Sequence, residues 1–429
     1  MVEKRTPLPV AEAVEQVMNH TQNQKKEWVA LEKAHGRYLA EDLKADHDVP
    51  SFDRSPYDGF AIIASDTTEA NQETPVVLEV IGKIGAGSVF ENEVRSGQAV
   101  RIMTGAQIPD SCNAVVMLEL VKEKQENGRN YIEIKRPFNE GDNISFQGED
   151  TKAGTSLIEQ GNFITPGISA LLATFGYHEV PVAKKPVIGV IATGSELLEV
   201  HEPLEPGKIR NSNAYMMMAQ IEKAGAEAKY FGKFSDDFDD CLRAVQDALS
   251  EVDLLITTGG VSVGDYDYVP AILEELGASV LFNKVGMRPG SVTTVAALDH
   301  KLIYGLSGNP SACYVGFELF VRPIIRHSLF TNKPHLRKSK AVLGADFPKP
   351  NPFTRFVRAK LYDEDGQYQA VPAGLDKSGS VTSLAEASAF IVLPGGTRGY
   401  EKGMAVDILM LDDEQGSEWP WANIVPSYR

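Results

Sequence analysis

The sequence predicts a multidomain α/β plus β protein whose α/β part contains a mostly parallel sheet. From about residue 186, apolar runs of strand length alternate with amphipathic segments of helix length, which is the pattern of a parallel sheet covered on both faces. Between about residues 46 and 145, and again after about residue 332, short β-like runs are separated by glycine and proline, which is typical of small β domains. The 429 residues are enough for about three domains.

The composition is that of an ordinary soluble globular protein, with 43% hydrophobic and 24% charged residues. The formal charge of −17 argues against nucleic acid or an anionic membrane as a partner. A small anionic substrate is compatible with this charge if a local basic site binds it. No signal-peptide core and no run of about 18 apolar residues occurs, so we expect a cytoplasmic protein with no membrane segment.

Cysteine usage gives no indication of a disulfide framework or a thiolate metal site. Cys112, Cys241 and Cys313 are far apart and odd in number, and no CxxC motif occurs. We therefore expect each cysteine to be a small core residue.

The N-terminal half predicts a helix, then a β domain, then another helix. Residues 8–45 give an amphipathic helix starting near Pro9 and a shorter helical piece ending at Gly36. Residues 46–145 contain the strand-like runs GFAII, PVVLEVIG, AVRIMTG, AVVMLEL and YIEIKR. Residues 146–180 include GISALLATFGY, which predicts a helix ending before Pro181.

The C-terminal half predicts the α/β domain and a terminal β domain. Its expected sheet strands are PVIGVIATG, AEAKYFGKF, VDLLITTGG and KLIYGLSG, with a weaker one at ASVLFNKV. The expected helices are NAYMMMAQIEKAGA, FDDCLRAVQDALSE, DYVPAILEELG and ACYVGFELFVRPIIR. The terminal β domain is predicted from AVLGADF, RFVRAKLY, QYQAVPA, AFIVLPGG and MAVDILML.

Four polar or glycine-rich turns follow strands of the expected parallel sheet: Thr193–Glu196, Ser235–Asp237, Thr257–Asp267 and Leu306–Ser311. Ligands of such sheets bind beyond the carboxyl ends of the strands. One such turn would be unremarkable, since glycine and asparagine suit turns, but four at one edge indicate a site. The third turn, with Gly259, Gly260 and Gly264, would expose backbone N–H groups able to hold phosphate.

Acidic residues in these turns predict a bound cation. Glu196, Asp236, Asp265 and Asp267 would crowd together above the sheet and repel one another, and an oxygen-ligated Mg²⁺ would resolve that repulsion. A Mg²⁺ bridging carboxylates and phosphate also reconciles an acidic loop with an anionic ligand. Asp236 and Asp267 each precede a predicted helix, so for any single acid helix capping stays an equal alternative.

The first β region adds two weaker candidates. Asp58-Gly59 follows Pro56 in a turn that leads into a strand, and Thr104-Gly105 follows the strand RIM. Taken alone, each is adequately explained as an ordinary turn.

Six motifs in this order, spread over nearly the whole chain, resemble the molybdopterin molybdenumtransferase family, which also includes the C-terminal domain of gephyrin: SPYDGFAI, RIMTGAQIP, QGED, IATGSEL, TTGGVSVGDYDYV and LSGNPSA. The resemblance implies an elongated homodimer. Its parts would be a helical linking domain (1–45 and 146–180), an inserted β domain (46–145), an α/β molybdopterin-binding domain (181–331) and a C-terminal β-barrel-like domain (332–429).

The resemblance also implies a reaction. Molybdenum from molybdate would be inserted into adenylylated molybdopterin with Mg²⁺, forming molybdenum cofactor and releasing AMP. The dithiolene of the cofactor supplies the sulfur ligands, which agrees with a chain lacking clustered cysteines. Asp58 and Thr104 of one subunit would face the α/β domain of the other, giving a composite site, and other cofactor-assembly proteins are further expected partners.

Carried over residue by residue, the resemblance implies three groups of site residues. The implied catalytic acids are Asp58, Asp150, Glu196, Asp236 and Asp267. The implied cofactor-binding residues are Thr104, Gly105, Thr193, Gly194, Ser195, Gly259, Gly260, Ser262, Gly264 and Asn309. Asp265 and Asp267 would hold Mg²⁺, and the implied molybdate-binding residues are Arg288, Ser291, Ser311, Arg358 and Ser383.

One stretch departs from the family. Many members read K-P-G-K-P where this chain has Arg288-Pro289-Gly290-Ser291-Val292. Arg288 keeps a charge and gains a bidentate fork, whereas Ser291 loses one cation. Arg288 also fits a plain surface charge before a Pro-Gly turn.

Two alternative functions remain, one of them also enzymatic and the other of a different class. A molybdopterin adenylyltransferase shares the α/β domain, but those proteins tend to be short single domains with a T-G-G-T-G loop, where this chain reads T-G-G-V-S. A non-catalytic dimeric scaffold of cofactor assembly would tolerate loss of the acids, all of which are present.

Overall fold

The structure is a computed structural model that describes residues 6–21, 25–234, 237–259, 268–350, 352–422 and 424. The chain forms two compact units, which we describe one at a time. The first comprises Met1–Glu41, Gln160–Ala170 and Tyr177–Arg429, and the second comprises Asp42–Glu159 and Leu171–Gly176. Among the described residues, no helix combines the length and apolar character needed to cross a membrane.

A six-stranded sheet forms the centre of the first unit, in the order β14-β11-β15-β19-β18-β16. The strands are β11 (Val187–Thr193), β14 (Glu227–Phe234), β15 (Leu254–Thr258), β16 (Ser279–Phe282), β18 (Thr294–Leu298) and β19 (Lys301–Leu306). The first four in the spatial order are parallel to one another. At one edge, β18 pairs antiparallel with β19, and β16 pairs antiparallel with β18. The predicted mostly parallel sheet is confirmed.

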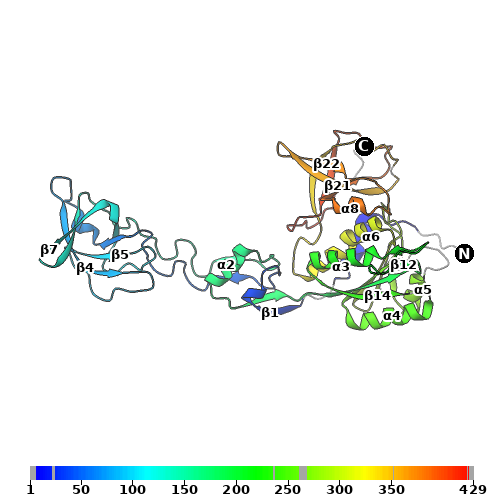
Figure 1. The fold of residues 1–429 in the computed structure, drawn as a ribbon, viewed down its shortest axis with the longest axis horizontal. Helices are drawn as coiled ribbons and strands as arrows, with labels where there is room; N and C mark the ends of the chain where they lie inside the picture. The colour runs from blue at the N-terminus through cyan, green and yellow to red at the C-terminus, as the bar shows by residue number, and fades with distance from the viewer. Residues whose placement is uncertain are drawn as a thin grey trace. The chain divides into compact units, whose positions relative to one another are not determined.

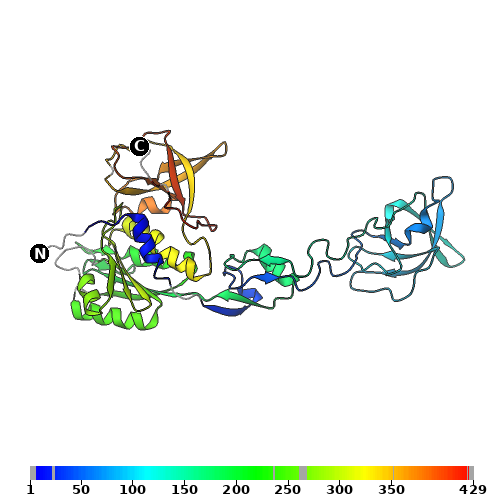
Figure 2. The same ribbon diagram turned by 180° about the vertical axis from the view of Figure 1, so that it is seen from behind.

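Helices cover both faces of this sheet, because successive strand residues are apolar and point to opposite faces. Leu255 of β15 faces a core with α4 (Phe238–Glu251) and α5 (Val269–Glu275). Its neighbours Leu254 and Ile256 face the opposite core. Figures 1 and 2 show α4 and α5 on one side, and α1, α3 and the α6–α7 segment on the other. The helices of this second side are α1 (Val10–Met18), α3 (Ser212–Ala224), α6 (Pro310–Gly316) and α7 (Arg322–Ser328), with the π-helical segment η4 (Phe317–Val321) between the last two.

The chain reverses direction across the sheet at β11. From β11 it passes through α3 to β14 on one side, and then through α4 to β15 on the other side of β11. Such a reversal leaves a crevice beyond the carboxyl ends of the two central strands, which is where open α/β sheets bind ligands. The turn after β11 and Gly259, the residue that follows β15, therefore lie where the sequence predicted a site.

The second helical piece predicted near the N-terminus is wrong. Residues Lys26–Ala30 form strand β1, which pairs antiparallel with β10 (Glu179–Ala183), and only one 3₁₀ turn, Leu31–Lys33, follows before Gly36. A five-residue run such as KEWVA carries too few periods to separate helix from strand, so pairing with β10 decides. The helix predicted from GISALLATFGY is present as α2 (Pro166–Thr174).

The C-terminal part of the first unit is a closed five-stranded barrel. Each strand pairs with two others in the cycle β20-β24-β23-β21-β22, and β22 returns to β20. The strands are β20 (Arg337–Leu343), β21 (Thr354–Glu364), β22 (Gln367–Pro372), β23 (Ala389–Leu393) and β24 (Ala405–Met410), and a short helix α8 (Thr382–Ala385) lies before β23. All five terminal strands were predicted, and closure removes the exposed edges that an open sheet would leave.

The second unit contains a six-stranded sheet in the order β6-β3-β5-β4-β8-β7. Its strands are β3 (Gly59–Ile62), β4 (Val76–Ile84), β5 (Gln98–Ile102), β6 (Ala114–Met117), β7 (Val121–Glu126) and β8 (Arg129–Ile134), and a separate pair joins β2 (Leu43–Lys44) to β9 (Ser156–Ile158). Phe60 and Ala61 lie in different cores, so both faces are buried. Strand β7, with the sequence VKEKQE, was not predicted. All three cysteines are buried, as expected.

Candidate functional site

Three predicted turns meet at one edge of the six-stranded sheet. The register pairs Ala192 of β11 with Thr258 of β15, and Thr258 with Leu306 of β19. Because these strands are parallel and end at the same level, the described residues that directly follow them are neighbours. The Gly259 N–H donates to the Leu306 carbonyl at 3.0 Å. The predicted clustering of Gly194, Gly259 and Asn309 is confirmed.

Gly259 is the residue that lets these turns approach one another. Its φ is +94°, and a Cβ at this position would lie 2.6 Å from the Thr193 carbonyl oxygen. The Cα of Gly259 would in turn lie 3.7 Å from a Cβ built on Gly308. A side chain at Gly259 would push the turns apart, so the sequence places a glycine where a backbone-lined site requires one.

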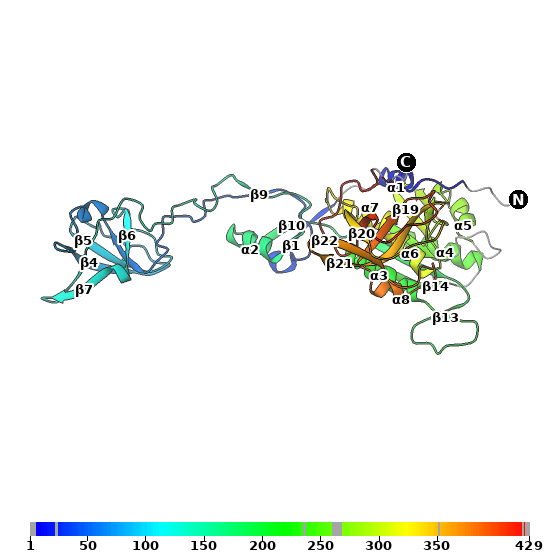
Figure 3. The same cartoon turned by 90° about the horizontal axis from the view of Figure 1, so that it is seen from above.

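The turn after β11 presents Glu196 above the sheet. A Cβ on Gly194 would lie 2.5 Å from Glu196 Oε2, so the carboxylate folds over that glycine. Ser195 and Glu196 are exposed. The Glu196 carbonyl accepts from Ile209 N at 2.9 Å, which ties this turn to the excursion between β12 (Leu197–Leu198) and β13 (Ile209–Arg210) visible in Figure 3.

Polar side chains that the sequence did not single out anchor this edge. The Tyr230 hydroxyl donates to Glu199 Oε1 at 2.9 Å and accepts from Asn211 Nδ2 at 2.9 Å. Burial, and then the Glu199 carboxylate, raise the pKa of Tyr230, so it stays a donor. Asn213 of α3 donates from Nδ2 to the Gly308 carbonyl at 2.9 Å, and so fixes the turn that precedes Asn309.

The predicted molybdate residues Ser311, Arg358 and Ser383 are brought together by one loop of the barrel. Ser311 Oγ donates to the Ser380 carbonyl at 2.6 Å, and Ser383 Oγ donates to Ser380 Oγ at 3.2 Å. Arg358 Nε donates to Ser383 Oγ at 3.3 Å. Ser311, Arg358 and Ser383 are at most 2% exposed, so hydroxyls and a guanidinium are held in fixed positions.

Arg288 and Ser291 lie on a neighbouring segment. Strand β17 (Met287–Arg288) pairs parallel with β21 and places Arg288 opposite Arg355. A Cβ on Gly290 would lie 3.2 Å from the Ala312 carbonyl, so this segment packs against α6. Arg288 is exposed, whereas the Ser291 hydroxyl donates to the Val285 carbonyl at 2.8 Å.

In the second unit, Asp58 and Thr104 are joined directly. Asp58 Oδ1 accepts from the Thr104 backbone N–H at 2.7 Å and from the Thr104 hydroxyl at 2.9 Å. These two hydrogen bonds, the backbone one first, lower the pKa of the exposed Asp58 carboxyl. The Gly105 N–H donates to the Ser55 carbonyl at 2.8 Å, which fixes the turn. Asp58 is therefore an ionised, oriented carboxylate.

Asp150 belongs to another part of the second unit. Its N–H donates to the Val49 carbonyl at 3.0 Å, and its side chain is exposed. The structure thus brings Asp58, Thr104 and Gly105 together, while Asp150 pairs with a different segment.

Six predicted site residues lie outside the described residues: Asp236, Gly260, Ser262, Gly264, Asp265 and Asp267. Their neighbour Asp237 caps α4, accepting from Asp240 N at 2.9 Å. Within the described parts of the chain, no group of three or more His, Cys, Asp or Glu side chains could hold a metal ion. The predicted Mg²⁺ site therefore depends on acids in the turns that are not described.

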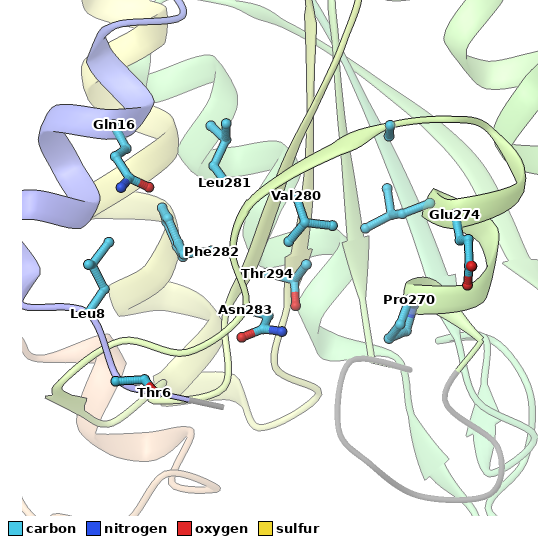
Figure 4. Close-up of a pocket in the computed structure, with 12 residues that line it drawn as sticks. Thr6, Leu8, Gln16, Pro270, Glu274, Val280, Leu281, Phe282, Asn283 and Thr294 are labelled. Atoms are coloured by element: carbon cyan, nitrogen blue, oxygen red, sulfur yellow. The ribbon is translucent and has the colours of Figure 1, made fainter. Parts of the chain in front are cut away.

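A cavity of about 610 Å³ opens beside this edge, between α5, β16 and the N-terminal segment (Figure 4). Thr294 pairs with Gly305 of β19 and so lies at the same end of the sheet as Gly259. The buried Thr294 Oγ1 and Gln16 Oε1 atoms have no hydrogen-bond partner among the described residues. The cavity thus has an apolar wall, which includes Val280 and Phe282, and two of its lining residues carry these buried polar atoms.

Comparison with known families matches most of the chain in three parts. Residues 8–176 match the model described as MoeA N-terminal region (domain I and II), and residues 189–327 match the model described as probable molybdopterin binding domain. Residues 340–411 match the model described as MoeA C-terminal region (domain IV).

Full-length relatives and solved structures agree with these matches. The chain is 61% identical to the molybdopterin molybdenumtransferase of Bacillus subtilis (strain 168), over 98% of both chains. It is 48% identical to the protein of the same name from Staphylococcus aureus (strain COL), over 97% of this chain and 99% of the relative. Two crystal structures of a molybdopterin biosynthesis MoeA protein from Pyrococcus horikoshii are similar, with TM-scores of 0.83 and 0.78 and identities of 30% and 32%. Each covers 94% of this chain, and the chain covers 99% and 100% of them.

Proposed function

The chain belongs to the MoeA family of molybdopterin molybdenumtransferases, and we propose that it inserts molybdenum from molybdate into adenylylated molybdopterin, releasing AMP. It is accordingly a transferase acting on small-molecule substrates. We propose that these substrates are anionic and that the protein is cytoplasmic. The observation that best supports this function is the meeting of two kinds of site at one edge. Glycine-rich turns after β11, β15 and β19 are suited to phosphate, and Ser311, Arg358 and Ser383 are suited to an oxyanion.

The two kinds of site are neighbours in the fold. Asn309 Oδ1 lies 3.5 Å from the position of a Cβ on Gly379, and Ser311 N donates to the Ser378 carbonyl at 2.9 Å. A turn of the α/β domain and a loop of the barrel are therefore in contact. A phosphate held by the first and an oxyanion held by the second would lie near each other, as transfer between bound substrates requires.

Mg²⁺ fits the donors that the chain offers. Carboxylate oxygens are its preferred protein ligands, and Glu196 presents an exposed carboxylate beside Gly194. We propose that Asp265 and Asp267 hold the ion, with Glu196 and Asp236 nearby. Mg²⁺ would supply charge neutralisation at the phosphate. The backbone N–H groups of the turns orient that phosphate, and Arg358 and the serine hydroxyls orient the oxyanion.

We further propose that the working enzyme is a homodimer with composite sites. The Asp58 carboxylate is exposed, ionised and fixed by Thr104, yet it belongs to the second unit. Family resemblance assigns it to the site of the opposite subunit, together with Thr104 and Gly105. Asp150 is proposed as a further catalytic acid on the same grounds. Other cofactor-assembly proteins are proposed as partners that deliver substrate or accept product.

The function is tested by following AMP. Purified protein is given adenylylated molybdopterin with and without molybdate, and with Mg²⁺ or with EDTA. We expect AMP release that requires both molybdate and Mg²⁺. Consumption of ATP with unmodified molybdopterin, without a molybdate requirement, would instead identify an adenylyltransferase. Absence of both activities in a folded protein would favour a scaffold.

A further inference from the structure

Asp376 lies at the centre of a charge cluster in the C-terminal barrel. Its Oδ2 accepts from Arg355 Nη1 at 2.8 Å and from Lys349 Nζ at 3.3 Å, and its Oδ1 lies 3.4 Å from Arg358 Nη1. We refer to Lys349, Arg355, Arg358 and Asp376 as the Asp376 cluster. Three cations around one carboxylate leave a net charge of two positive, in a chain whose formal charge is −17.

The Asp376 cluster is built into the proposed oxyanion site. Arg358 Nη2 donates to the Leu375 and Lys377 carbonyls at 3.1 and 3.3 Å, so it holds the loop that carries Asp376. Four residues beyond Asp376 on this loop, Ser380 contacts both Ser311 and Ser383. The residual positive charge thus lies on a loop that contacts the residues proposed to bind molybdate. Arg358 is 2% exposed, so part of this charge is poorly hydrated, and burial lowers the pKa of the Arg358 guanidinium.

Lys349 is the member of the cluster whose charge reaches solvent. Its side chain is 48% exposed, whereas those of Arg355 and Arg358 are 10% and 2% exposed. Lys349 is also restrained, because Nζ donates to the Asp376 carbonyl at 3.1 Å as well as to its carboxylate, and lies 5.4 Å from the centre of the Phe347 ring. A lysine already held in place loses less conformational entropy when an anion binds than a free surface lysine does.

We propose that Lys349 is a further oxyanion-binding residue, which helps the Asp376 cluster to attract and neutralise a doubly charged tetrahedral oxyanion at the Ser311–Arg358–Ser383 site. This inference rests on the proposed function. A dianion matches the residual charge of the cluster, and a residue that acts on the free oxyanion should affect its binding and not the later step.

The test compares Lys349→Gln with Lys340→Gln, a matched control. Lys340 lies on β20 of the same barrel, is 79% exposed and pairs with Asp407, away from Asp376. For each variant, AMP release is measured against molybdate concentration at low and moderate salt, and binding of molybdate alone is measured by calorimetry. We expect Lys349→Gln to raise the KM and Kd for molybdate about tenfold, to leave kcat unchanged and to weaken the salt dependence. Lys349→Arg should restore most of the affinity.

The outcomes separate this inference from the proposed function. If wild-type protein releases AMP on addition of molybdate but Lys349→Gln behaves like Lys340→Gln, Lys349 has no role at the oxyanion site. A fall in kcat at unchanged KM would also overturn the inference, since it would indicate a structural effect. If wild-type protein neither binds molybdate nor releases AMP, the proposed function itself fails.

Discussion

Replacing Gly259 by alanine tests whether the close approach of the three turns creates the site. Two separate costs are expected. The φ of +94° disfavours alanine by about 1–2 kcal/mol. In addition, the new Cβ would lie 2.6 Å from the Thr193 carbonyl, and relieving such a contact costs about 1–3 kcal/mol more.

A matched variant separates these costs. Gly232 of β14 has φ +97°, but nothing lies within 4 Å of a Cβ built there. Gly232→Ala should therefore lose only the stability that the positive φ costs alanine, which lowers Tm by roughly 2–8 °C. Its rate of AMP release should stay near that of the wild-type protein. Gly259→Ala should unfold at a still lower temperature, because the turn after β11 must move.

The assay is AMP release at saturating molybdate, with thermal unfolding measured in parallel. Displacement of the phosphate-binding turns by even about 1 Å should reduce the rate of Gly259→Ala on the order of a hundredfold. If Gly259→Ala and Gly232→Ala match in both stability and rate, the turns do not form a site that depends on their contact, and the reasoning is refuted.

Two other predictions concern Asp58 and the subunit arrangement. Asp58 has a lowered pKa, so its ionised form is present above that pKa and is lost as the pH falls through it. Thr104→Val removes one of the two hydrogen bonds that stabilise the ionised form, so the pKa of Asp58 should rise. The acid limb of the pH–rate profile of AMP release should therefore move to higher pH. An unchanged acid limb would show that Asp58 does not control activity. Mixing inactive Asp58→Ala and Asp267→Ala subunits should restore about one working site per heterodimer, measured as AMP release after exchange of subunits. If subunit exchange is demonstrated and the mixture stays inactive, each site lies within one chain.

Much of the fold could be predicted because its signals are local. The apolar runs that became β11, β15 and β19 each end in glycine and polar residues, so both the strands and their shared edge followed from the sequence. Strand β7 was missed because VKEKQE has no apolar alternation, and it is held by pairing with β8. The local sequence before Gly36 predicts a helix, whereas Lys26–Ala30 form a strand whose pairing partner lies about 150 residues away.

Site residues could be predicted from the sequence only where they belong to a recognisable motif. Asp58 and Thr104 lie 46 residues apart and were associated through resemblance, and the structure shows the hydrogen bonds that join them. Asn213, whose partner Gly308 is 95 residues away, carried no signal beyond its place near a helix start. The Asp376 cluster was also hidden, because Asp376 meets Lys349, Arg355 and Arg358 only when β21 and β22 pair, and because the whole chain is strongly acidic.

A crystal structure with AMP and molybdate both bound would test the central claim most directly. We predict the AMP phosphate against the Gly194 and Gly259 turns, and molybdate among Ser311, Arg358 and Ser383. Anomalous scattering from molybdenum would locate the oxyanion without ambiguity. Molybdenum bound elsewhere on the chain, or AMP at the opposite end of the sheet, would contradict the proposal that one edge of this sheet brings the two reactants together.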